Sequence, residues 1–321
     1  MKTSSRYIGL GLIFLLLAAF PLIAPLFGLE FYIGFVRRVL VVALAAASLN
    51  FILGFGGMVA LGHAGFIGMG AYTVVALSDA GVMSAWIMWP AAALVAGLVA
   101  ALIGTVALRT RGVYFIMVTL AFAQMAFFVF HDTKIGGGSD GIYMYVRPAI
   151  GALDMENRTV LFYVVLASLV FTYGLLALVR RSRFGAALAG IRVNEQRMRA
   201  AGFAVYGYKL AAFVLAGALA GLAGFLLASR DGVVNPELMA WHNSGEVLLM
   251  VILGGLGHLR GAVIGAIAFT LLKEIFSTHA VMGPLADHWQ LTLGIAIIVF
   301  VAWLPKGLIG LVKRLSPKET A

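Results

Sequence analysis

Cysteine is absent from the 321 residues, which excludes disulfides, thiolate metal sites and a cysteine nucleophile. Charged residues are scarce: they make up 11% of the chain, against about 25% in an average soluble domain. So few charges cannot cover the water-facing surface of a soluble protein of this length. Strict alternation of apolar and polar residues is also absent, which argues against a transmembrane β-barrel.

Motifs for ATP hydrolysis and zinc-dependent catalysis are missing as well. The chain has no G-x-x-x-x-G-K-[ST] and no H-E-x-x-H pattern, and its six histidines show no metal-ligand spacing. We therefore expect a protein that is not an enzyme and that binds no metal or cofactor itself. Acids and bases are nearly absent from the middle of the apolar runs. The sequence thus predicts an interior of neutral polar groups, unlike that of a proton-driven carrier.

Long apolar runs dominate what is present. The chain is 62% hydrophobic with a mean hydropathy of +1.03. Runs of nearly 20 apolar residues recur, each long enough to cross about 30 Å of hydrocarbon as a helix. The sequence predicts an all-α fold, a polytopic bundle of about 8–10 transmembrane helices, some broken or re-entrant where glycine is frequent. The expected spans are 8–27, 39–54, 64–80, 86–108, 113–131, 159–179, 209–229, 244–257, 261–277 and 287–304.

Charge placement predicts the orientation. Lys2 and Arg6 precede the first apolar run as in a signal peptide, but the run is long and lacks a small-x-small cleavage site, so we interpret it as an uncleaved span. With the N-terminus in the cytoplasm, 16 of the 23 basic residues fall on the inner side, and the C-terminus is cytoplasmic too. The formal charge of +10 then reflects topology, not nucleic-acid binding. Arg37 and Arg38 are exceptions that either snorkel at the outer interface or show that the second span starts elsewhere.

Two glycine-rich stretches, 52–71 and 252–266, resemble each other. Both read I-L-G, then a glycine-rich turn, then a Gly-His pair and spaced small residues. One interpretation is a weak internal two-fold repeat, an organisation common among transporters. The other is that glycine is frequent in packed membrane helices because it lets backbones approach closely.

Residues 180–209 form the one long polar segment. They carry seven of the 23 basic residues and a single acid, Glu195. Apolar residues recur within the segment at helical spacing, which predicts one or two short helices at the inner membrane face. The segment is either a solvated loop that sets orientation or a docking helix for a cytoplasmic partner. Its small residues, which allow close approach, and its basic residues, which can pair with acids, fit the docking interpretation.

Neutral polar residues in the predicted spans are candidates for a substrate path. They are Asn50, His63, Tyr72, Thr119 and Gln124. Any one of these alone is more often a packing residue in a membrane bundle. The longest outer loop, 131–158, contains Gly137, Ser139 and Asp140, which are turn residues first and also a candidate surface for an external partner.

Six motifs follow one another along nearly the whole chain. They are LNFILGFGGMVALGHAGFIGMG at 49–70, TRGVYFIMVTLAFAQ at 110–124, the glycine run at 136–141, RVNEQRMRAAG at 192–202 followed by a small-residue span, VILGGLGHLRGAVIGA at 251–266, and LPKGLIG at 304–310. Together they resemble the permease subunits of branched-chain amino acid ABC transporters, the LivM type. The resemblance implies one permease domain over 1–321, in a bacterial inner membrane, that moves branched-chain amino acids by alternating access.

The resemblance also implies partners. They are a second homologous permease subunit, two cytoplasmic subunits that bind ATP and magnesium, an external substrate-binding protein and the lipid bilayer. Within 180–209 it implies a helix that couples to the ATPase, with its signature at Arg192, Asn194, Glu195, Ala200, Ala201 and Gly202. In the general pattern an acid directly precedes the two alanines. Glu195 stands further upstream, a departure that bears on Glu195 more than on Gly202.

Three alternatives stay open. Permeases for urea and short amides look similar, and a neutral path does not separate them from the branched-chain type. A stand-alone secondary carrier or channel would move solute without ATPase subunits. A purely structural membrane subunit would tolerate changes at Asn50, His63 and Gln124.

Overall fold

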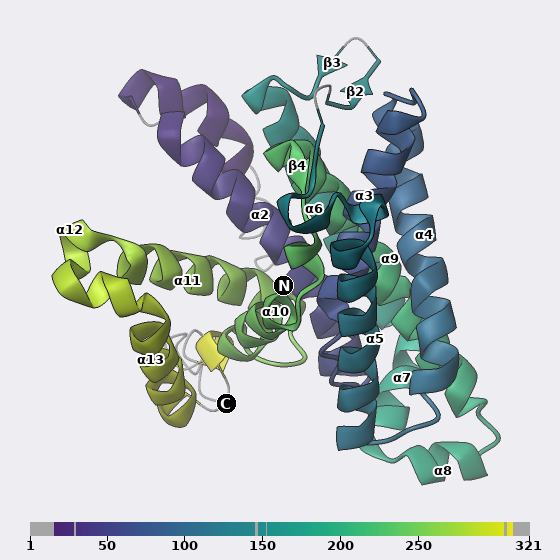
Figure 1. Ribbon diagram of the computed structural model, residues 1–321. Coiled ribbons are helices and arrows are strands. Elements are labelled where there is room, and N and C mark those ends of the chain that lie inside the picture. The colour runs from purple at the N-terminus through teal and green to yellow at the C-terminus, as the bar shows by residue number, and fades with distance from the viewer. Residues whose placement is uncertain (1–15, 29, 145–146, 152, 305–306, 311–321) are drawn as a thin grey trace.

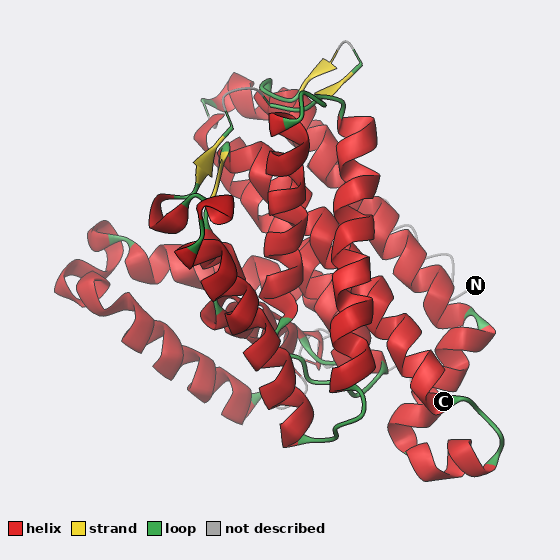
Figure 2. Cartoon of the chain, turned by 45° about the vertical axis from the view of Figure 1, so that its right-hand side comes forward, coloured by secondary structure: helices red, strands yellow, loops and turns green. Residues whose placement is uncertain are grey.

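The computed structural model describes residues 16–28, 30–144, 147–151, 153–304 and 307–310, and helices dominate it (Figures 1 and 2). The longer helices are α2 (Glu30–Asn50), α3 (His63–Asp79), α4 (Ala85–Ala107), α5 (Val113–Asp132), α6 (Arg158–Arg181), α7 (Arg183–Val193), α9 (Val205–Asp231), α10 (Trp241–Gly254), α11 (Leu259–Ser277) and α13 (Trp289–Trp303). The short ones are α8 (Glu195–Ala200), α12 (His279–Met282), the π-helical turn η2 (Phe51–Phe55) and the 3-10 turns η1 (Ala24–Phe27), η3 (Lys134–Gly136), η4 (Gly138–Asp140), η5 (Pro236–Met239) and η6 (Gly283–His288).

The predicted all-α polytopic bundle is confirmed. Among the described residues, six helices are long and apolar enough to cross a membrane, and α10 with α11, bent by 115°, makes a seventh span if the pair is counted as one. The sequence predicted about 8–10 spans. The ten listed ranges exceed the observed number because residues 8–15 of the first range lie outside the described residues, because α3 is about 25 Å long and so shorter than a hydrocarbon core, and because 244–257 and 261–277 are the two arms of the bent pair.

Four short strands lie at one end of the bundle. β1 (Ile142–Tyr143) pairs antiparallel with β4 (Val233–Val234), and β2 (Ala149–Ile150) pairs with β3 (Leu153–Asp154). Helices α7 and α8 lie at the opposite end (Figure 1). We call the end with the strands the loop end and the end with α7 and α8 the elbow end. Helix α9 connects them, because it follows α8 directly and ends beside β4.

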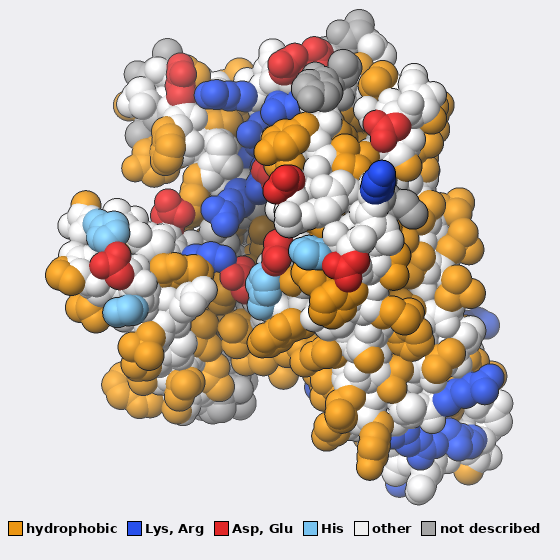
Figure 3. Space-filling model, in the orientation of Figure 1, with side chains coloured by type: hydrophobic (Ala, Val, Ile, Leu, Met, Phe, Trp, Pro, Cys, Tyr) orange, Lys and Arg blue, Asp and Glu red, His pale blue; other side chains and the backbone are white. Residues whose placement is uncertain are grey.

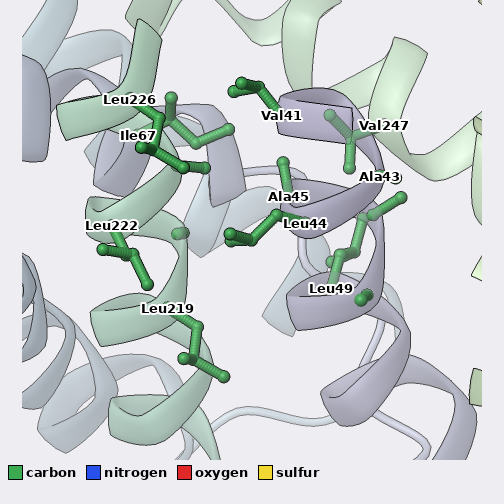
Figure 4. Close-up of a cluster of buried hydrophobic side chains, with 14 of the residues drawn as sticks. Val41, Ala43, Leu44, Ala45, Leu49, Ile67, Leu219, Leu222, Leu226 and Val247 are labelled. Carbon is green, nitrogen blue, oxygen red and sulfur yellow. The ribbon is translucent and has the colours of Figure 1, made fainter. Parts of the chain in front are cut away.

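The core of the bundle surrounds α2 and α9. In the most apolar window of each span, 83% of the residues are buried for α2 and 67% for α9, against 17% for α5. Side chains from α2, α3, α9 and α10, including Leu44, Ile67 and Leu222, point into one shared apolar region (Figure 4). Helix α5 is therefore a peripheral element, with most of that window left for lipid or for a partner subunit.

Small residues let the central helices pack backbone to backbone. A methyl group on Gly70 would collide with Gly221, and one on Gly224 would collide with the carbonyl of Ile67, so α3 and α9 touch along their main chains. Helix α4 meets α9 in the same way, with Ala96 against Gly221. Such contacts are typical of membrane helices, where close van der Waals packing replaces the hydrophobic effect.

Helix α2 starts earlier than predicted. It begins at Glu30 rather than at residue 39, so Arg37 and Arg38 lie two turns inside a helix and not in a loop. Of the two explanations for these arginines, the structure confirms that the second span starts elsewhere. The polar pair lowered the local hydropathy and concealed the first turns of the helix.

Candidate functional site

Two N-caps divide the basic segment into helices. The Ser182 hydroxyl accepts from the Gly185 amide at 3.4 Å and begins α7, and the Asn194 side chain accepts from the Arg197 amide at 2.9 Å and begins α8. Such caps satisfy amides that have no partner inside the helix, and each is worth about 1 kcal/mol. The prediction of one or two short helices in 180–209 is confirmed. We call α7, α8 and the turn to α9 the elbow.

The elbow presents small and apolar groups outward. Ala200, Ala201 and Gly202 are exposed, and the side chain of Val193 is 85% exposed. Gly202 has φ +86°, and a methyl group built on it would meet no other atom within 4 Å. Ala200, Ala201 and Gly202, three of the six predicted coupling residues, thus lie on a surface that the described part of the chain leaves uncovered.

Glu195 holds the elbow to the bundle. Its carboxylate accepts from Lys209 Nζ at 2.6 Å and from Arg199 Nη2 at 2.7 Å, and Arg111 Nη2 lies 3.4 Å away. Partial burial raises the pKa of Glu195, but the hydrogen bond and charge of Lys209, with the charges of Arg111 and Arg199, outweigh it and hold the pKa below its ordinary value. The single acid of the segment is therefore an internal tie between α8, α9 and the α4–α5 turn.

Arg192 extends from the elbow into the bundle. Its guanidinium donates to the carbonyl of Gly54 in η2. It also lies against two glycines with positive φ: a methyl group on Gly57 would be 3.1 Å from Arg192 Cγ, and one on Gly257 would be 3.4 Å from Arg192 Nη1. One side chain of the elbow thus contacts the end of α2 and the break between α10 and α11 together.

Asn50 also contacts the break between α10 and α11. Its side-chain amide donates to the His258 carbonyl at 3.0 Å, and its oxygen accepts from the Gly257 amide at 3.2 Å. A methyl group on Gly54 would lie 2.6 Å from Gly257 N, so the two glycine-rich stretches of the sequence meet here. Close packing accounts for these glycines, and the structure does not show an internal two-fold repeat. We call Asn50, Gly54, Arg192, Gly257 and His258 the junction.

The remaining predicted path residues make hydrogen bonds or lie buried in more than one part of the bundle. His63 is fully buried with Nε2 2.8 Å from the Ser48 hydroxyl. The Thr119 hydroxyl accepts from the Leu61 amide at 3.3 Å. These contacts hold the loop before α3.

Tyr72 and Gln124 lie apart from that loop. The Tyr72 hydroxyl donates to the Gly136 carbonyl at 3.0 Å, and Gln124 Oε1 is buried without a hydrogen-bond partner among the described residues. The structure does not gather Asn50, His63, Tyr72, Thr119 and Gln124 into one site.

The glycine loop at the loop end is exposed at the three predicted positions. Gly137, Ser139 and Asp140 all face outward. Residues 137–141 formally match the G-x-S-x-G pattern of a hydrolase nucleophile, which requires a strand, a sharp turn and a helix. Here the serine lies within η4, and its hydroxyl donates to Asp140 at 3.4 Å. The loop has the chemistry of a surface turn.

A cavity of about 210 Å³ opens between α2, α3, α9, α10 and α11. Its lining contains both apolar and charged residues. The apolar lining is Val41, Val42, Ala45, Ile67, Leu227, Leu238, Val247, Met250 and Phe269, and the polar lining is Arg38, Arg230, Asp231, Asn243, Glu246, Thr270 and Lys273. Figure 3 shows basic and acidic side chains gathered along a hollow in the middle of this face.

Two ion pairs organise the charged part of the lining. Arg230 donates to both oxygens of Asp231, through Nε at 2.6 Å and Nη2 at 2.8 Å. Lys273 donates to Glu246 at 2.6 Å and lies 5.1 Å from the centre of the Trp289 ring. The expectation of a purely neutral interior is wrong for this cavity.

More basic residues surround the cavity than line it. Arg37 is within electrostatic range of Arg147, Arg158 and Arg230, and Arg147 lies beside Gly232 at the end of α9. Seven basic residues fall outside the inner side in the topology inferred from the sequence, and six of them converge here; the seventh, Lys134, is in the outer loop. Sequence reasoning missed this group because its members are separated by up to 236 positions. The one available signal was the placement of Arg37 and Arg38 against the charge rule.

No metal centre is found in the part of the chain that the structure describes. Nowhere in it do three or more histidine, cysteine, aspartate or glutamate side chains come together. The chemistry available to the elbow, the junction and the cavity is that of docking, hydrogen bonding and charge.

Comparison with known proteins places the sequence among membrane permease components. The sequence profile of the family described as branched-chain amino acid transport system / permease component matches residues 31–302. The high-affinity branched-chain amino acid transport system permease protein LivM of Salmonella typhimurium is 30% identical over 285 residues, or 81% of this chain and 66% of that protein. LivM of Escherichia coli is 30% identical over 286 residues with the same coverage.

A more distant relative shares part of the chain. The xylose transport system permease protein XylH of Escherichia coli is 29% identical over 162 residues, or 48% of this chain and 40% of that protein. The chain spans just under two thirds of the length of the LivM proteins. No solved structure gives a significant match.

Proposed function

Because this chain belongs to the family of branched-chain amino acid transport system permease components, we propose that it is the membrane subunit of an ATP-driven importer for branched-chain amino acids. It forms a single permease domain and contributes no covalent chemistry. The loop end faces outward and receives substrate from an external binding protein. The elbow end and both termini are cytoplasmic, in the inner membrane of a bacterium.

The proposed assembly contains a second, homologous permease subunit and two ATP-binding subunits. The sparsely buried α5 is a surface on which lipid or the second permease can lie. The elbow docks on an ATP-binding subunit through Val193, Ala200, Ala201 and Gly202, and its exposed basic side chains pair with acids there. ATP and magnesium are bound by those partners.

The contact of Arg192 with the junction carries this proposal. A movement of the elbow changes the position of Arg192, which holds the end of α2 through Gly54 and lies against Gly257 at the break of α10 and α11. Both segments continue into helices that line the charged cavity. Docking at the elbow is therefore connected, through Arg192 and the helices that it contacts, to the lining of the charged cavity.

Substitution at Gly202 tests the docking role. Gly202→Trp adds bulk to an open surface, and we expect loss of ATP-driven leucine uptake with normal membrane insertion and with ATPase activity that no longer depends on substrate. Gly202→Asn is the matched control, since asparagine tolerates positive φ and adds little bulk. Normal coupled uptake in Gly202→Trp would contradict docking at this surface.

The charged cavity favours amino acids over the neutral alternatives. A permease for urea or short amides needs hydrogen-bonding groups and not paired full charges, because buried charges are costly unless they serve recognition or structure. Uptake of leucine against urea in the reconstituted transporter separates these cargoes. Solute movement by the purified chain alone, driven by an ion gradient, would instead support a secondary carrier.

A further inference from the structure

We infer that the cavity between α2, α9, α10 and α11 is a transit site that binds a zwitterionic amino acid, with Arg230 on its carboxylate and Glu246 on its ammonium group. This inference rests on the proposed transport function and adds the place and the chemistry of recognition.

Arg230 is built as a carboxylate receptor. Asp231 engages Nε and Nη2, which fixes the plane of the guanidinium. The remaining nitrogen, Nη1, is buried and has no hydrogen-bond partner within the described chain. An unpaired N–H on a charged, desolvated group is costly, and a carboxylate oxygen is the acceptor that suits it best.

The surplus of positive charge attracts the same end of the solute. Arg38, Arg230 and Lys273 line the cavity against two acids, Asp231 and Glu246. Arg37, Arg147 and Arg158 add further positive charge nearby. A space with a net positive charge in and around its lining raises the local concentration of the opposite charge, so the carboxylate enters favourably.

Glu246 supplies the acceptor for an ammonium group. Its Oε1 binds Lys273, and the Lys273 charge is also held by the Trp289 ring at 5.1 Å. Because Lys273 has this second contact, Glu246 can share its charge with a substrate ammonium without leaving the lysine isolated. Opposite charges in one cavity lining then match the two ends of an α-amino acid.

The apolar part of the lining accepts an apolar side chain. Val41, Ala45, Ile67 and Val247, which Figure 4 places on α2, α3 and α10, contribute methyl groups only. A volume of about 210 Å³ is below the range of about 300–1,000 Å³ that holds drug-sized ligands, so the site suits a small solute. Side-chain size rather than hydrogen bonding sets selectivity in this part of the lining.

Site-directed labelling tests occupancy without relying on transport. Since the chain has no cysteine, Val42→Cys introduces one thiol into the cavity lining at little change in size. In the full transporter in proteoliposomes, we expect leucine to slow reaction of this thiol with a maleimide reagent. The α-keto acid of leucine, which keeps the carboxylate, should protect as well but more weakly, and leucinamide, which lacks it, should not. Val193→Cys on the elbow should react equally with and without leucine.

Arg230→Gln in the Val42→Cys background should raise the leucine concentration for half-protection about tenfold or more, the effect of losing one charge-assisted hydrogen bond. Lys134→Gln removes a charge that lies at the loop end of the bundle but outside the cavity. This variant should leave protection unchanged. Equal protection in Arg230→Gln and Lys134→Gln, or protection by leucinamide equal to that by leucine, would overturn the assignment.

Exchanging the residues of the Glu246–Lys273 ion pair tests whether Glu246 binds the substrate or only stabilises the structure. The double variant Glu246→Lys with Lys273→Glu retains a pair of opposite charges but moves the acceptor. We expect a chain that folds yet shows weak leucine protection, whereas full protection would reduce Glu246 to a structural role and overturn its assignment.

ATP-driven uptake, measured on the same vesicles, distinguishes the two proposals. Leucine uptake without protection of Val42→Cys contradicts the transit site and leaves the importer function standing. Protection without ATP-driven uptake contradicts the importer function and supports the site.

Discussion

The basic segment 180–209, which contains the elbow, and the charged cavity near the loop end both gather basic residues and use them differently. The seven basic residues of 180–209 lie within one short stretch of sequence, and three basic side chains, two of them from this segment, surround one acid, Glu195, while much of the surface stays exposed. At the loop end six come from positions 37 to 273 and converge on a cavity in which Arg230 and Lys273 have acidic partners. In the proposed function, the basic segment offers a surface to another protein. The charges that the fold brings together from distant positions instead line an interior space that, as we infer, holds a small solute.

The junction connects the elbow with the helices that line the charged cavity, so changes in the junction test this connection. Gly54→Ala places a methyl group 2.5 Å from Asn50 Oδ1 and 2.6 Å from the Gly257 amide, both held in place by the same hydrogen bonds. We expect a loss of about 3 kcal/mol in the free energy of unfolding, the upper range for overpacking. Thermal unfolding of the purified chain in detergent measures it.

Gly174→Ala is the control for that experiment. A methyl group on Gly174 in α6 meets no other atom within 4 Å, so the change should be neutral or slightly stabilising. Equal stability of the two variants would show that the elbow end and the cavity are not joined through a tight contact.

Arg192→Gln weakens the same link without adding bulk. The variant loses a charge-assisted hydrogen bond to Gly54, and we expect coupled uptake to fall about tenfold while ATPase activity persists. Arg197→Gln, which removes an exposed charge from α8, should change uptake far less. If both variants lose uptake equally, the net charge of the elbow matters and the junction contact does not.

Glu195→Gln examines the acid at the centre of the elbow. We expect a loss of about 1–2 kcal/mol in stability at neutral pH, because Lys209 and Arg199 lose their charged partner. Since the folded pKa of Glu195 is lowered from 4.5, its contribution is complete above about pH 4.5 and disappears as the pH falls through the folded pKa. The unfolding curves of the two proteins should therefore converge in acid, and a constant difference at all pH values would contradict this role.

The smallest expected effect is at the cap of α8. Asn194→Ala should cost about 1 kcal/mol and increase hydrogen exchange in 195–200, whereas Asn194→Asp should retain the cap. Gln196→Ala, an exposed change on the same helix, should leave exchange unaltered. Similar exchange in Asn194→Ala and Gln196→Ala would mean that docking and not capping orders the helix.

Local signals in the sequence predicted the helices and the elbow. Apolar runs placed α4, α5, α6 and α9 within a few residues, and the polarity of 180–209 singled out the elbow. These features depend on neighbouring residues only, so periodicity and composition are sufficient to find them.

Features that depend on the contacts between helices were not predictable. The cavity lining comes from five helices and η5, and its members share no sequence pattern. Neutral residues such as His63 and Thr119 drew attention as path candidates because polar groups are rare in apolar runs. Their hydrogen bonds secure the loop before α3. Burial with a partner cannot be distinguished from burial beside a substrate by residue type alone.

The shortness of α3 has a consequence for biogenesis. This helix is too short to span a bilayer comfortably, and its close backbone contact at Gly70 is with Gly221 of α9, a helix that begins at Val205, long after α3 ends at Asp79. During synthesis α3 therefore lacks its packing partner until α9 emerges from the ribosome. Until then we expect α3 to remain beside the insertion machinery or in locally thinned lipid. The middle of the protein is completed late, and a chain truncated before α9 leaves α3 as a ready target for membrane quality control.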